Sequence, residues 1–95
     1  MEYQYPCSQH WTTEEIIAVI DFFQAVEKAY EKGIARDEFM SQYRRFKKIV
    51  PGKAEEKKVA KEFEELSGYS AYLVFQKAQQ AEDNKMIFMK SQSSL

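Results

Sequence analysis

The chain has 95 residues, which suits one domain, and 31% of them are charged. The net charge is −1 and there is a single cysteine, so neither a strong basic field for nucleic acid nor an intrachain disulfide is available. Residues 1–11 have neither the basic nor the apolar region of a secretory leader, so we expect none, and no apolar run is long enough to cross a bilayer. We therefore expect a cytoplasmic protein, with residues 1–85 as a single all-helical domain and residues 86–95 as a partly disordered tail.

The first elements are an extended strap over residues 1–11 and an amphipathic helix over residues 13–32. Thr12 is a good N-cap for this helix, and Glu15 stands three residues later, which completes a capping box. Gly33 is placed where a left-handed residue closes a helix. The apolar positions cover about half of the helix circumference, as expected of a helix that packs against two neighbours.

Two further helices are predicted over residues 36–49 and 54–67. The first has acidic residues in its opening turn and basic residues near its end, which is the charge order that the helix dipole favours. Pro51 then breaks it. The second has a narrow apolar face and is otherwise charged, so we expect an outer helix, and Gly68 ends it. The residues of this narrow face are Val59, Ala60, Phe63 and Leu66.

A fourth helix is predicted from the N-cap Ser70 to about Glu82. Its buried side carries mainly small residues, which permit close packing, and Tyr72 and Leu73 are expected to widen the buried arc. After it, the apolar run at residues 86–89 has no place on a helix face. It can fold back on its own bundle, or pack on a second copy or on another protein. The predicted fold class is all-α: a compact four-helix array with an extended N-terminal strap.

Several segments resemble the YktA-like uncharacterised protein family of Bacillus-type bacteria. They are YQYP, WTTEE, FFQAVEKAYEKG, YRRFKKIVP, EEKK, FEE and SGYS, and they lie in this order between residue 1 and about residue 82. The resemblance implies an all-helical, cytosolic bacterial protein of the Firmicutes. It implies no activity, and it carries over no catalytic or binding residues.

The residues for catalysis or for binding a metal are few. Cys7 and His10 form a C-x-x-H pair, but a zinc site wants about four ligands, so the pair would need acidic residues or a second copy of the chain. His10 is the only histidine, and the three glycines all follow predicted helices rather than forming a phosphate-binding loop. We expect no catalytic residues, no cofactor and no metal, and no small-molecule substrate is evident.

One basic run offers a polyanion contact. Arg44, Arg45 and Lys48 lie near the end of the second predicted helix, where they could touch phosphate groups. The helical spacing splays these side chains over the helix, and a helix C-terminus attracts cations for local reasons alone. Nucleic acid is therefore the alternative partner rather than the first.

The remaining notable feature is the aromatic content, which is 15% of the chain. In a domain this small, such side chains are needed for the core, so we assign them to the core rather than to a ligand cage. The set comprises Phe22, Phe23, Phe39, Tyr43, Phe46, Phe63 and Phe75. The sequence thus favours a non-enzymatic protein-interaction domain, with an unknown protein partner or self-association. The alternative is a nucleic-acid-associated accessory protein.

Overall fold

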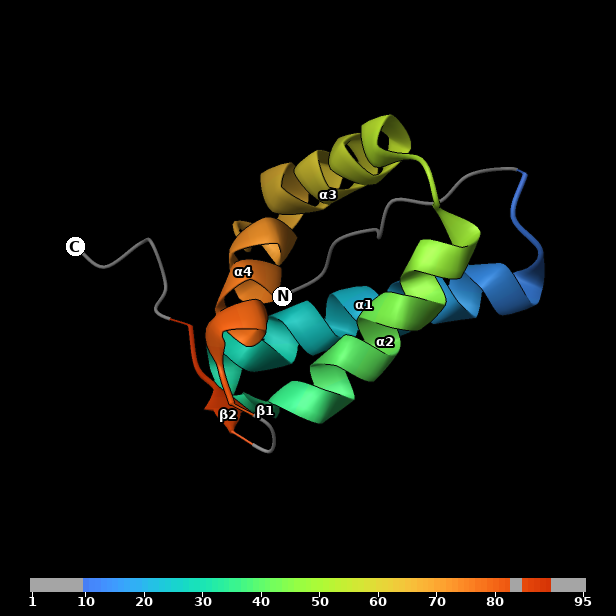
Figure 1. The fold of residues 1–95 in the computed structure, drawn as a ribbon. Coiled ribbons are helices and arrows are strands. Elements are labelled where there is room, and N and C mark those ends of the chain that lie inside the picture. Colours follow the sequence, from blue (N-terminus) through green and yellow to red (C-terminus); the bar gives the residue numbers. More distant parts are fainter. Residues whose placement is uncertain (1–9, 83–84, 90–95) are drawn as a thin grey trace.

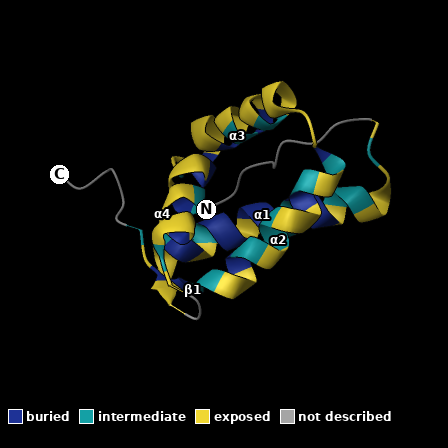
Figure 2. Cartoon of the chain, viewed as in Figure 1, coloured by how far each residue is buried: buried dark blue, intermediate teal, exposed yellow. Residues whose placement is uncertain are grey.

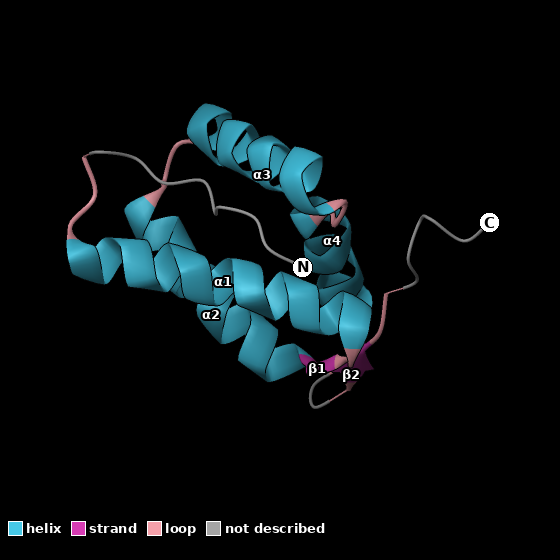
Figure 3. Cartoon of the chain, turned by 180° about the vertical axis from the view of Figure 1, so that it is seen from behind, coloured by secondary structure: helices cyan, strands magenta, loops and turns pink. Residues whose placement is uncertain are grey.

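The computed structural model describes residues 10–82 and 85–89. These residues form α1 (Thr13–Glu31), β1 (Ile34–Ala35), α2 (Arg36–Ile49), α3 (Lys53–Ser67), α4 (Ala71–Gln80) and β2 (Met86–Ile87). The long helix α1 and helix α2 lie side by side, and α3 lies across from this pair (Figure 1). Helix α4 runs from the end of α3 down to the two strands, beside the C-terminal half of α1 (Figures 1 and 3). The predicted all-α class is confirmed, with one very short sheet added.

Both ends of α1 follow from side chains that the sequence places there. The backbone N–H of Glu15 donates to Thr12 Oγ1 at 3.1 Å, and the N–H of Thr12 donates to Glu15 Oε1 at 2.8 Å, so the capping box is confirmed. At the other end, Gly33 has φ +91° and its N–H donates to the carbonyl oxygen of Lys28 at 2.7 Å. The left-handed glycine therefore closes the helix as predicted.

The other helix boundaries differ little from the predicted ones. Helix α2 has the predicted bounds, and α3 begins one residue early, at Lys53. Gly68 ends α3 with φ +81°. Helix α4 begins after Ser70, whose Oγ accepts the N–H of Leu73 at 3.2 Å, but it ends at Gln80 rather than near residue 82.

The two short strands are the element that the sequence did not predict. They pair antiparallel, with Ile34 opposite Ile87 and Ala35 opposite Met86. The side chain of Ile87 is 1% exposed, and the N–H of Met89 donates to the carbonyl oxygen of Ala29 at 2.9 Å. Of the alternatives for the apolar run 86–89, the structure therefore has the one in which it folds back on its own helices. Most of the predicted strap, residues 1–9, lies outside the described residues.

Five phenylalanines form the centre of the core, each at most 2% exposed. They are Phe22, Phe23, Phe39, Phe46 and Phe63. Two stacked pairs join the elements: the rings of Phe22 and Phe46 are 4.5 Å apart, and those of Phe23 and Phe63 are 4.3 Å apart. The buried positions lie on the sides of α1 and α2 that face each other and the other helices (Figure 2). Most of the predicted aromatic set is thus core, whereas Tyr43 and Phe75 are half-buried.

Three apolar side chains predicted to be buried are exposed instead. Tyr72 is 64% exposed, Leu73 37% and Leu66 45%. Helix α4 packs on the bundle through Val74 and Ala78, so the side that carries Tyr72 and Leu73 faces away from the core. The predicted wide buried arc of α4 is therefore wrong. None of the described helices is long and apolar enough to pass through a membrane.

Candidate functional site

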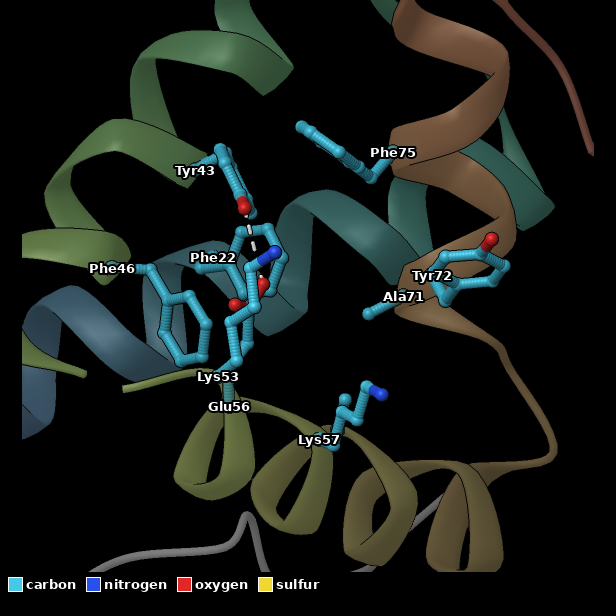
Figure 4. A pocket seen from close by; sticks show the side chains of 10 residues that line it. Phe22, Tyr43, Phe46, Lys53, Glu56, Lys57, Ala71, Tyr72 and Phe75 are labelled. Carbon is cyan, nitrogen blue, oxygen red and sulfur yellow. Dashed lines mark hydrogen bonds between the residues drawn. The ribbon is translucent and has the colours of Figure 1, made fainter. Parts of the chain in front are cut away.

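A cavity of about 290 Å³ lies between α2, α3 and α4, over the middle of α1 (Figure 4). Aromatic rings form much of its wall: Phe22 from α1, Phe46 and Tyr43 from α2, and Phe75 from α4. The Tyr43 and Phe75 rings stack 4.3 Å apart, which joins α2 to α4. This arrangement makes a recessed, mostly apolar surface on a small helical domain.

The small side chains of Ala60 and Ala71 complete the lining where α3 meets α4. Alanine at both positions leaves room that larger apolar residues would fill. The cavity therefore exists because the facing positions of the two helices carry short side chains, while Tyr72 at its edge points outward (Figure 4).

A hydrogen-bonded group fixes the wall between α2 and α3. The Tyr43 hydroxyl donates to Glu56 Oε2 at 3.1 Å, and Lys47 Nζ donates to Glu56 Oε1 at 2.8 Å (the Tyr43 bond is drawn in Figure 4). Burial, followed by the hydrogen bond to the Glu56 carboxylate, raises the pKa of Tyr43 to about 12. The Tyr43 hydroxyl is therefore protonated at neutral pH and donates its hydrogen bond. The Glu56 carboxylate accepts from both Tyr43 and Lys47 of α2.

A second, more open hollow continues from the cavity along α3. It shares Lys57, Ala60, Ala71 and Tyr72 with the first hollow. It adds residues further along α3 and at the start of α4, namely Lys61, Glu64 and Ser70. We call the two together the α3–α4 groove. It has an apolar floor and one rim on α3, which carries three lysines and Glu64, and Tyr72 lies on the other rim. The lysines are Lys53, Lys57 and Lys61.

The predicted polyanion residues Arg44, Arg45 and Lys48 all lie in the C-terminal half of α2. Arg45 Nη1 lies 3.2 Å from Asp21 Oδ2 and donates to Gln42 Oε1 at 2.9 Å, so its charge is neutralised against α1. Arg44 and Lys48 are exposed, one turn apart on α2. Contact of these three residues with a polyanion stays a prediction.

The Cys7–His10 pair is not tested, because Cys7 lies outside the described residues; His10 is exposed. Within residues 10–82 and 85–89, no three His, Cys, Asp or Glu side chains gather closely enough to hold a metal ion.

A second polar cluster joins the end of α1 to the start of α4. The rings of Tyr30 and Tyr69 stack 4.6 Å apart, the Tyr69 hydroxyl donates to Glu31 Oε2 at 2.9 Å, and Tyr30 accepts the N–H of Ser70 at 3.2 Å. Burial and then the hydrogen bond to Glu31 raise the pKa of Tyr69. Burial and then the charge of Glu31 also raise the pKa of Glu27. The bonds of this cluster hold two elements together, which is a structural role.

The α3–α4 groove is not among the features that the sequence predicts. A signal was present: Lys53, Lys57 and Lys61 are each four residues apart, which places them in one row along a helix. That row predicts a basic edge, but not the hollow beside it, because the hollow depends on how α3 is tilted against α4.

Comparison with known proteins gives a consistent result over almost the whole chain. The model of the uncharacterised protein family UPF0223 matches residues 2–87. The chain is 58% identical to the UPF0223 protein YktA of Bacillus subtilis over 86 residues, which cover 90% of this chain and 98% of that protein. It is 60% identical to a UPF0223 protein of Bacillus pumilus over 89 residues, which cover 94% of this chain and all of that protein.

A relative from outside the genus Bacillus is similar as well. A UPF0223 protein of Lysinibacillus sphaericus is 53% identical over 87 residues, which cover 92% of both chains. The family match reaches residue 87 and so includes β2, which the resemblance in the sequence had left out. The resemblance to the YktA-like proteins is confirmed, and the chain belongs to the uncharacterised protein family UPF0223.

Proposed function

We propose that this protein is a non-enzymatic, cytoplasmic protein-interaction domain that binds its partner through the α3–α4 groove. The observation that carries the proposal is the recessed apolar floor of this groove, beside the exposed ring of Tyr72. Exposed apolar surface next to a hollow is what binding surfaces offer, because a partner side chain that enters it removes apolar area from water.

The test is photo-crosslinking in Bacillus cells from within the groove. A photoreactive amino acid replaces Tyr72, which lies at the groove edge, and in a second strain it replaces Ser41, which is exposed on α2 and lines neither hollow of the groove. We expect a discrete crosslinked protein from position 72 and not from position 41. The absence of a product at position 72, or the same products from both positions, would contradict the proposal.

A variant that fills the groove can be compared with a matched variant that carries the same substitution outside it. Ala60→Trp places a large ring in both hollows, whereas Ala54→Trp places the same ring at an exposed position of α3 outside them. Each variant is combined with the photoreactive residue at position 72, after circular dichroism has shown a normal helix content. The crosslink should be lost with Ala60→Trp and kept with Ala54→Trp.

A nucleic-acid-associated role is the second candidate, and the exposed pair Arg44 and Lys48 favours it. The ion pair of Arg45 with Asp21 and the net charge of −1 weigh against it. Binding to RNA or DNA that falls steeply with salt, and that Arg44→Glu combined with Lys48→Glu abolishes, would favour this candidate over the groove.

A further inference from the structure

The α3 rim of the groove carries three lysines in a row. Lys53, Lys57 and Lys61 follow each other at four-residue spacing, which corresponds to about 6 Å of rise per step along the helix. None of the three has an ion pair with another residue of the part of the chain that the structure describes.

The acidic groups beside this row do not neutralise it. Glu56 lies between Lys53 and Lys57 in sequence, but its carboxylate accepts from Tyr43 and pairs with Lys47 of α2 at 2.8 Å. Glu64 lines the second hollow together with Lys57 and Lys61, but it has no ion pair within the described residues. The rim therefore presents ammonium groups that a partner can neutralise, in a chain whose net charge is −1.

The apolar floor and the lysine rim together indicate what kind of ligand the groove binds. The half-buried side chains of Tyr43, Ala60 and Phe75 offer apolar contact, with the buried rings of Phe22 and Phe46 beneath them. The hollow of about 290 Å³ accommodates a large apolar side chain. The lysines offer charge-assisted hydrogen bonds to carboxylates spaced about one helical turn apart. We propose, on the basis of the interaction function proposed above, that the groove binds an acidic peptide segment of a partner protein, with one large apolar side chain entering the cavity.

Nucleic acid fits the groove less well, although it is also an anion. Helix α3 also carries exposed carboxylates at Glu55 and Glu62, and Glu65 follows Lys61 by four residues. These charges repel a phosphate backbone that runs along the whole helix. An acidic peptide segment can place its carboxylates on the lysine row alone and keep an uncharged side there for the apolar floor.

The experiment begins with the segment that crosslinks to position 72, identified by mass spectrometry. A synthetic peptide of that segment is titrated with the full chain, and binding is followed by fluorescence anisotropy. We expect the crosslinked segment to contain several acidic residues around an aromatic or branched aliphatic residue. Lys57→Glu combined with Lys61→Glu should weaken binding by at least about tenfold, because like charges then face each other.

Lys58→Glu is the matched control, because Lys58 is exposed on the same helix and lines neither hollow. It should change the dissociation constant by less than about twofold. A groove-dependent crosslink to a neutral or basic segment would overturn the acidic assignment and leave the interaction function standing. Unchanged binding of the double variant would overturn it too, as would a second copy of this chain or a nucleic acid as the product. The absence of any crosslink would remove the interaction function and the acidic assignment together.

Discussion

Gly33 is subject to two separate constraints at a single residue. Its φ of +91° lies in the left-handed region, and a Cβ built on it would overlap the ring of Phe88. Gly68 has a similar φ, +81°, but open space around it, and Gly52 has an ordinary φ of −77° and open space. Comparing substitutions at the three glycines therefore distinguishes the effect of a positive φ from the effect of steric overlap with a neighbouring side chain.

We expect the three Gly→Ala variants to fall in a definite order of stability. Gly52→Ala should change the free energy of unfolding by less than about 0.5 kcal/mol. Gly68→Ala should cost about 1 kcal/mol through its positive φ, and Gly33→Ala clearly more, because the Phe88 ring must also move. Urea unfolding checks this order, and equal effects at Gly33 and Gly68 would mean that Phe88 does not constrain the turn.

Tyr43 makes the stability of the fold depend on pH in the alkaline range. Its pKa in the folded chain is about 12, above the ordinary value of 10.0, so the folded state holds the phenol proton more tightly than the unfolded state does. The resulting stabilisation is fully present below about pH 10 and is lost as the pH rises towards 12. Tyr43→Phe lacks the titrating group and the bond to Glu56, so its stability deficit relative to the natural chain should shrink over this range.

The measurement is urea unfolding of both proteins at a series of pH values, with the Tyr43 ring signal followed by nuclear magnetic resonance. A deficit that stays constant from neutral pH to pH 12 would contradict the assigned cause of the shift. A Tyr43 signal that titrates near 10, the ordinary tyrosine value, would contradict the shift itself.

At the scale of the element, β2 has a structural role. Ile87 is 1% exposed and pairs with Ile34, whereas its neighbour Met86 is 51% exposed. Ile87→Ala should therefore cost about 2–4 kcal/mol of unfolding free energy, and Met86→Ala less than about 0.5 kcal/mol. Urea unfolding of the two variants decides this, and similar losses would show that the strand pairing is not coupled to the core.

This placement also changes how the tail can be tested. Removing residues 86–95 would remove Ile87 from the core, so lost binding in such a truncation would not show that the tail contacts a partner. Single changes at exposed positions such as Met86 keep the fold and are the better probes.

The elements that could be predicted from the sequence are those fixed by local chemistry. The capping box at Thr12 and the glycine after α1 are short-range signals, and their positions were correct. The pairing of β1 with β2 joins residues more than fifty positions apart, and each strand has two residues, too few to show a repeating pattern. Such a strand arises from tertiary packing and not from its own sequence.

At the scale of the whole molecule, the contrast between local sequence signals and tertiary packing explains why the groove could not be predicted. Helical periodicity tells which residues of α4 are apolar, but not which of them another helix will cover. Tyr72 and Leu73 were assigned to the buried side by their apolar character, yet α4 packs through Val74 and Ala78. The hollow depends on how α3 and α4 are placed against each other. This placement rests on contacts between residues far apart in the sequence, such as the stacking of Phe63 of α3 on Phe23 of α1.

Helix α3 is attached to the rest of the domain by few buried groups, and this predicts its dynamics. Its buried residues are Val59, Phe63 and Ser67, and its remaining positions are mostly charged and exposed. The Glu56 contacts with Tyr43 and Lys47 add a polar link to α2. Amides of α3 should therefore exchange through local opening, at a lower free energy than amides of α1, whose buried face is continuous.

Glu56→Ala should lower the opening free energy of α3 by about 1–2 kcal/mol, since it removes a charge-assisted link, and should leave α1 nearly unchanged. Glu55→Ala is the control, because Glu55 is exposed on the same helix and has no hydrogen bond or ion pair within the described residues. Native-state hydrogen exchange resolved by helix measures both effects. If Glu56→Ala speeds exchange in α1 and α3 equally, the two helices unfold as one unit. The α3 wall of the groove would then open only together with the core.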